Sequence, residues 1–130
     1  MTDLTIKPTH TCFDDAGAIF VNMLRESPLK VNRLRVVHAI CLMPETHKAY
    51  THAWVEDGNE VLFNGVYQDK VVTVVVDKQE FYAEMRVQDF TAYDAQELIV
   101  LDKRYGNTGP WKQKYLELCK DYHPSKALQS

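Results

Sequence analysis

The sequence lacks long apolar runs and any large excess of one charge. No segment approaches the roughly 20 apolar residues that a membrane helix requires, and the first residues show no basic stretch leading into an apolar one. The 15 basic and 18 acidic residues leave a net charge of -3, which provides no basic surface for nucleic acid. We therefore expect a cytoplasmic protein with neither a membrane nor a nucleic-acid partner.

Cysteine, glycine and proline are also few. The three cysteines, Cys12, Cys41 and Cys119, are odd in number and widely spaced, which argues against a disulfide framework and against paired-cysteine zinc sites. No tract rich in glycine, serine or proline interrupts the chain. Since 45% of the 130 residues are hydrophobic, we predict one domain spanning 1–130 with its own core and with flexible ends, above all the segment 123–130.

Apolar spacing predicts the first helix. From Cys12 to about Glu26, hydrophobic residues recur three and four positions apart, as they do on one face of an amphipathic helix. Thr11 can cap this helix, and Ser27 with Pro28 can end it. Cys12 is therefore expected in the first helical turn.

Strands and further helices are predicted after this helix. The strand-like runs are Arg33 to Met43, Ala49 to Glu56, Glu60 to Tyr67 and Val71 to Val76. The last run is almost continuous valine, so we expect both of its faces to be covered. Helices are predicted from Lys78 to Arg86, from a capping box at Asp94 and Glu97 to Gly106, and from Pro110 onward. This order predicts an α+β fold, with the N-terminal helix packed on an antiparallel sheet and further helices in the C-terminal half.

Among the cysteines, Cys12 is the candidate nucleophile. A helix N-terminus stabilises a thiolate through its unpaired backbone N–H groups and its dipole. Cys41 falls within a strand and Cys119 within the apolar stripe of the last helix, so we expect both to be inert core thiols. The alternative for Cys12 is a small buried residue that happens to start a helix.

His52 is the candidate base. It lies in the middle of a strand, two residues from Trp54 and hence on the same face. His38 differs from it, because it alternates with Val36 and Ile40 on an expected core face. A strand histidine can also have a purely structural role.

Asn64 is the candidate that orients His52. If residues 57–59 form a three-residue loop, His52 lies opposite Asn64, whose amide oxygen can accept the imidazole N–H. If Asp57 and Gly58 form a two-residue turn instead, His52 pairs with Phe63, and Asn64 points to the opposite face. The predicted triad depends on this one residue of register.

These residues, in this order, resemble the transglutaminase-like group within the papain-like cysteine enzymes. The resemblance covers roughly Thr11 to Tyr67, and its matching segments are CFDDA at 12–16, RVVH at 35–38, HAWVE at 52–56 and VLFN at 61–64. It implies that Cys12 is the nucleophile, that His52 is the base and that Asn64 orients it. This group usually has an aspartate in the third position, whereas papain-like proteases use an asparagine.

The sequence therefore predicts a thiol-dependent enzyme that acts on an amide or related acyl bond of a peptide, a protein or a small molecule, without a cofactor or metal. Cys12 would form an acyl-enzyme, which is then released to water or to an amine. The alternative is a non-catalytic binding or interaction protein with the same fold. A third hypothesis is a metal site of His47, His52 and Asp57, whose spacing matches no recognisable ligand pattern.

Overall fold

A six-stranded antiparallel sheet lies at the centre of the computed structural model, which describes residues 7–9 and 11–122. Its strands are β1 (Lys7–Pro8), β2 (Leu34–Leu42), β3 (Ala49–Asp57), β4 (Glu60–Tyr67), β5 (Lys70–Asp77) and β6 (Asp89–Tyr93). They follow the order β1-β4-β3-β2-β6, and β5 also pairs with β4. The segment 123–130, which we expected to be flexible, lies outside the described residues.

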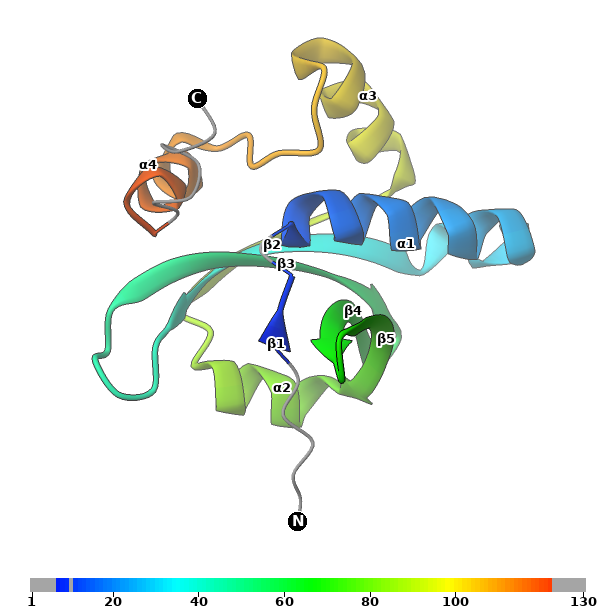
Figure 1. Ribbon diagram of the computed structural model, residues 1–130. Coiled ribbons are helices and arrows are strands. Elements are labelled where there is room, and N and C mark those ends of the chain that lie inside the picture. Colours follow the sequence, from blue (N-terminus) through cyan, green and yellow to red (C-terminus); the bar gives the residue numbers. More distant parts are fainter. Residues whose placement is uncertain (1–6, 10, 123–130) are drawn as a thin grey trace.

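Helices cover both faces of this sheet. They are α1 (Cys12–Glu26), the 3-10 helix η1 (Pro28–Asn32), α2 (Lys78–Met85), α3 (Ala95–Tyr105) and α4 (Gln113–Tyr122). Helices α1, α3 and α4 lie on one side of the sheet and α2 on the other (Figure 1). The predicted α+β fold, with its N-terminal helix on an antiparallel sheet, is confirmed. None of the helices within the described residues has the length and apolar character needed to cross a membrane.

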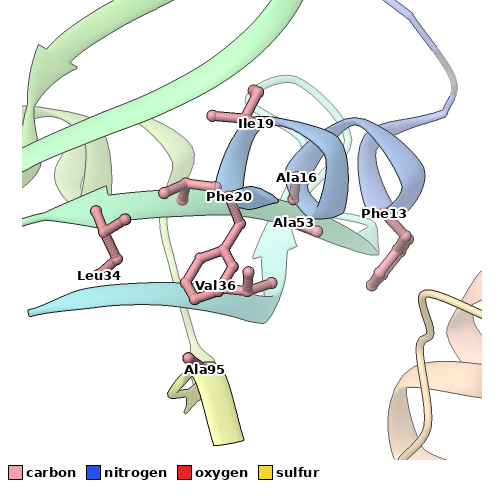
Figure 2. Close-up of a cluster of buried hydrophobic side chains, with 9 residues drawn as sticks. Phe13, Ala16, Ile19, Phe20, Leu34, Val36, Ala53 and Ala95 are labelled. Atoms are coloured by element: carbon pink, nitrogen blue, oxygen red, sulfur yellow. The ribbon is translucent and has the colours of Figure 1, made fainter. Parts of the chain in front are cut away.

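Helix α1 forms where its apolar spacing places it and packs one face on the sheet. Ala16, Ile19 and Phe20 are buried on that face, and the Phe20 ring points toward Val36 of β2 (Figure 2). The helix begins at Cys12 and ends before Ser27, as predicted. Thr11 occupies the capping position, but its hydroxyl donates to Asp15 and caps no backbone N–H.

The two sheet faces bury separate sets of side chains. The α1 cluster is made of Phe13, Ala16, Ile19, Phe20, Leu34, Val36, Ala53, Val55 and Ala95. The α2 cluster is made of Val37, Ala39, Cys41, Tyr50, Trp54, Val61 and Phe81. Because successive strand residues point to opposite faces, odd-numbered residues of β3 face α1 and even-numbered ones face α2.

Strand β4 leaves β3 soon after their shared turn. The two strands pair only from Asp57–Glu60 to Val55–Leu62, whereas β4 pairs with β5 over its whole length. The valine-rich β5 was expected to be covered on both faces, but Val71 and Val75 are 65% and 51% exposed. Valine suits a pleated strand even on an exposed face, so a run of valines does not by itself indicate burial.

The C-terminal half differs from prediction in two places. Strand β6 was missed, and it pairs with β2 between Val36–Tyr93 and Ile40–Asp89. Helix α4 begins at Gln113 and not at Pro110, and Gly109 before it has φ = 101°. Residues 106–112 therefore cross from α3 to α4 as an irregular segment.

Candidate functional site

Cys12 lies at the start of α1, as predicted, in a setting that disfavours its thiolate. Burial, together with the neighbouring Cys119 and Asp15, raises the pKa of the Cys12 thiol to about 12. Hydrogen bonds from the backbone N–H groups of Ala53 and of Cys12 itself act in the opposite direction and are outweighed. At neutral pH Cys12 is therefore a protonated thiol, contrary to our expectation that the helix start would activate it.

His52 lies on the other face of the sheet. Its ring belongs among the aromatic side chains of the α2 side, with centroid distances of 5.6 Å to Trp54, 6.3 Å to Phe81 and 6.4 Å to Phe63. Burial lowers the pKa of His52 to about 4, so the ring is neutral at physiological pH. Cys12 packs with Ala53 on the α1 side, and the structure therefore does not bring the predicted nucleophile and base together.

Asn64 lies away from both. The β3–β4 turn is the two-residue loop Gly58 and Asn59, so that Asp57 pairs with Glu60, and both registers we considered are wrong. Gly58 takes the first central position with φ = 63°, as glycine does in type II′ hairpin turns. This register puts Asn64 on the face opposite to His52. Its Oδ1 accepts the Thr73 hydroxyl of β5 at 2.7 Å.

Trp54 and Glu56 of the HAWVE segment have structural roles on the α2 side. The Glu56 carboxylate is buried and is neutralised by Lys78, with 3.0 Å between Nζ and Oε1. Its Oε2 accepts hydrogen bonds from the Trp54 indole N–H, at 3.0 Å, and from the Tyr82 hydroxyl. Trp54 and Glu56 thus tie β3 to α2.

The remaining thiols and the metal hypothesis have clear outcomes. Cys41 and Cys119 are buried, as expected, with 0% and 3% of their surfaces exposed. Within the described part of the chain, no three metal-binding side chains gather at one point. His47 precedes β3 and Asp57 is its last residue, which separates them by about 30 Å at the rise of an extended strand, so they share no metal site.

A pocket of about 400 Å³ opens on the α1 side of the sheet. We call it the α1–α3 pocket, because α1 and α3 form its walls and the segment before α4 closes one end. Its lining residues are Asp14, Gly17, Ala18, Val21, Asn22, Val36, Leu98, Asp102, Thr108 and Trp111. The sequence pointed to none of them as part of a site, since Trp111 was assigned to the helix predicted from Pro110 onward. A tryptophan beside a turn rich in glycine, proline and threonine was the available signal.

Trp111 is held in place at the end of this pocket. Its indole N–H lies 3.0 Å from Asn107 Oδ1 and 3.3 Å from the Asn107 carbonyl oxygen. The ring meets Tyr93 edge-on at 5.2 Å and lies tilted over His38 at 5.1 Å. Thr108, beside it, donates its hydroxyl to Asp14 at the start of α1.

His38 forms the layer beneath Trp111. It is fully buried among Phe13, Tyr93 and Trp111, and neither ring nitrogen has a hydrogen-bond partner among the residues that the structure describes. Burial lowers the pKa of His38 to about 3, so the ring is neutral. The core position expected for His38 is confirmed, and it is the histidine that shares a sheet face with Cys12.

Comparison of the chain with protein-family models, curated proteins and solved structures finds no match. The function is therefore argued from the pocket and its surroundings alone.

Proposed function

We propose that this chain is a non-catalytic binding protein and that the α1–α3 pocket is its ligand site. The observation that carries the proposal is the separation of Cys12 and His52 by the sheet, which leaves the thiol without the predicted base. A neutral thiol and a neutral imidazole on opposite faces cannot form the thiolate–imidazolium pair that this kind of catalysis uses.

The pocket has the properties of a small-ligand site. Its volume of about 400 Å³ lies within the usual range for such sites, and most of its lining is apolar. Polar groups are few and sit at the rim, where Asp14, Asn22 and Asp102 can fix the orientation of a ligand. Trp111 offers a flat surface whose position is already set by Asn107, so binding would cost little ordering.

The test is a ligand screen read by the two tryptophan indole N–H signals in ¹⁵N NMR spectra. We expect fragments from a mixed set of cationic, neutral and anionic compounds to shift the Trp111 signal. The Trp54 signal should stay fixed, because that ring is buried on the opposite face.

A filled pocket provides the control for this screen. Ala18→Phe places a ring in the pocket and should abolish the shifts, whereas Ala83→Phe adds the same ring to the exposed surface of α2 and should not. If no compound moves the Trp111 signal in the wild-type protein, or if Ala18→Phe leaves the shifts intact, the proposal fails.

The second candidate is the thiol-dependent enzyme acting on an amide or acyl bond. What favours it is the place of Cys12 at the start of α1, where the unpaired backbone N–H groups and the helix dipole can stabilise negative charge. Its base would have to be His38, on the same face, because His52 is not. The alkylation rates described in the Discussion separate the two candidates.

The proposal also places the protein in the cytoplasm, with a small molecule or a peptide side chain as partner. The three cysteines support this location, because the structure joins none of them in a disulfide. A net charge of -3 favours such partners over nucleic acid.

A further inference from the structure

The rim of the α1–α3 pocket carries negative charge from two different helices. Asp14 comes from the first turn of α1, and Asp102 comes from the last turn of α3. No lysine, arginine or histidine is among the described residues that line the pocket. Because opposite charges attract across such a rim, a bound group with a positive charge would gain from both carboxylates.

Neither carboxylate is neutralised by a cationic side chain within the described residues. The salt bridges there join Lys30 and Arg33 to Asp57, Lys78 to Glu56, and Lys114 to Asp89. Asp14 accepts a hydrogen bond from the Thr108 hydroxyl, which leaves its charge in place. The acidic groups that do have cationic partners, Glu56, Asp57 and Asp89, lie elsewhere on the sheet.

The aromatic wall suits the same kind of ligand. A cation over the face of a tryptophan ring is attracted by its π electrons, and tryptophan is the best of the aromatic residues for this contact. Trp111 needs no rearrangement, since Asn107, Tyr93 and His38 already fix its ring. The His38 ring behind it is neutral, so it does not oppose a positive charge in front of the indole.

The apolar part of the pocket limits the ligand further. The side chains of Val21, Val36 and Leu98 offer no hydrogen-bonding groups, so a small hydrated ion would lose water contacts against them without replacing them. A short hydrocarbon stem would instead bury apolar surface against them.

We propose that the α1–α3 pocket binds an organic cation, an ammonium or guanidinium group on a short apolar stem such as the side chain of lysine or arginine. The stem lies against Val21, Val36 and Leu98, and the charged group lies between Trp111 and the carboxylates of Asp14 and Asp102. This inference rests on the proposed binding function and adds the chemical class of the ligand.

A matched set of blocked amino acids tests the charge. The N-acetyl amides of arginine, lysine, norleucine and glutamate present comparable stems with positive, neutral or negative ends, and butylguanidine presents the cation without a peptide. We expect the arginine and lysine compounds to shift the Trp111 indole signal, with binding that weakens as salt is added. Norleucine should bind more weakly, and glutamate should not bind. If butylguanidine binds and the blocked arginine does not, the cation is confirmed and its source is a small molecule.

Charge variants provide the second arm. Asp102→Asn and Asp14→Asn keep the size of each side chain, and the amide oxygen that the second change introduces would still accept the Thr108 hydroxyl. Each should weaken cation binding about two- to fivefold, as expected for partly exposed charges. Glu84→Gln, an equal loss of charge on the exposed surface of α2, should change nothing.

These experiments distinguish a failure of the cation inference from a failure of the proposed binding function. If the norleucine and lysine compounds bind equally, or if neither aspartate variant weakens binding, the inference that the ligand is a cation is wrong. The pocket would then remain a ligand site. If nothing in this set or in the broader fragment screen moves the Trp111 signal, both proposals fall.

Discussion

At the scale of single residues, Cys12 distinguishes the binding protein from the enzyme. A thiol with a pKa of about 12 has almost no thiolate at pH 7.5, and the thiolate is the reactive form. We expect iodoacetamide to alkylate Cys12 at least about tenfold more slowly than a reference cysteine introduced by Leu29→Cys, where the side chain is 95% exposed. Peptide mass spectrometry over time gives both rates in the same molecule.

Two histidine variants complete this comparison. His52→Phe should leave the rate at Cys12 unchanged, because His52 lies across the sheet. Rapid labelling of Cys12 that slows in His52→Phe would show that the two residues meet in solution and would restore the predicted triad. Rapid labelling that slows only in His38→Phe would favour the second candidate with His38 as its base.

At the scale of elements, the segment between α3 and α4 depends on Gly109. This residue has φ = 101°, and a Cβ atom placed on it would lie 2.5 Å from Cε1 of the buried His38 ring. We expect Gly109→Ala to cost about 2–4 kcal/mol of unfolding free energy, through backbone strain plus the clash. Urea unfolding measures the loss, and the Trp111 indole signal should move because the clash displaces its neighbour.

Gly106→Ala is the matched control for this change. Gly106 also has a positive φ, of 69°, but a Cβ there meets nothing within 4 Å. Gly106→Ala should therefore lose only about 1 kcal/mol of unfolding free energy, from backbone strain, and the Trp111 signal should not change. Equal losses for the two variants would show that a Cβ atom at position 109 is accommodated without a clash with His38.

The same elements show what the sequence could and could not reveal. Helix α1, predicted from Cys12 to about Glu26, is confirmed, because its apolar spacing and its end signals agree. The β3–β4 register was not, because Asp57, Gly58 and Asn59 allow several turns that differ by one residue. That single residue decides which face Asn64 occupies, so β3 and β4 were predicted as strands and Asn64 was still placed on the wrong face.

The pocket was missed for a different reason. Its walls come from Asp14 and Asp102, which are 88 positions apart (102 - 14), and from Trp111, which was assigned to a helix that starts later. Local patterns predict single elements, whereas a pocket depends on how distant elements pack. His38 was placed correctly in the core because alternation along one strand is a local pattern.

At the scale of the whole molecule, two neutral histidines, the buried His38 and the half-buried His52, make stability depend on pH. The pKa values of His38 and His52 are lowered by burial to about 3 and about 4, below the value of about 6.5 in an unfolded chain. As pH falls below 6.5, the unfolded chain takes up protons that the folded chain does not. The free energy of unfolding should therefore fall with pH, by up to about 1.4 kcal/mol per pH unit for each histidine.

At alkaline pH, the free energy of unfolding changes with pH in the opposite direction. Burial raises the pKa values of Cys12 and Cys41 to about 12, so above pH 9 the unfolded thiols ionise first and stability falls as pH rises. Urea unfolding followed by circular dichroism should show a plateau between about pH 7 and 8.5, with a decline on both sides. His52→Phe should remove about half of the slope between pH 6.5 and 5; a flat wild-type profile there would mean that the histidines are not buried in solution.

The sheet also divides the molecule into two compartments that can change independently. Phe20 packs in the α1 cluster and Phe81 in the α2 cluster, with the sheet backbone between them. Phe20→Leu and Phe81→Leu should each destabilise the protein, and their double variant should match the sum to within about 0.5 kcal/mol. A larger coupling would show that strain passes through the sheet. If the effects add, substitutions around the pocket need no compensating change in the α2 cluster. They could then accumulate over evolution, or be introduced to redesign the specificity of the pocket, while the α2 cluster continues to stabilise the fold.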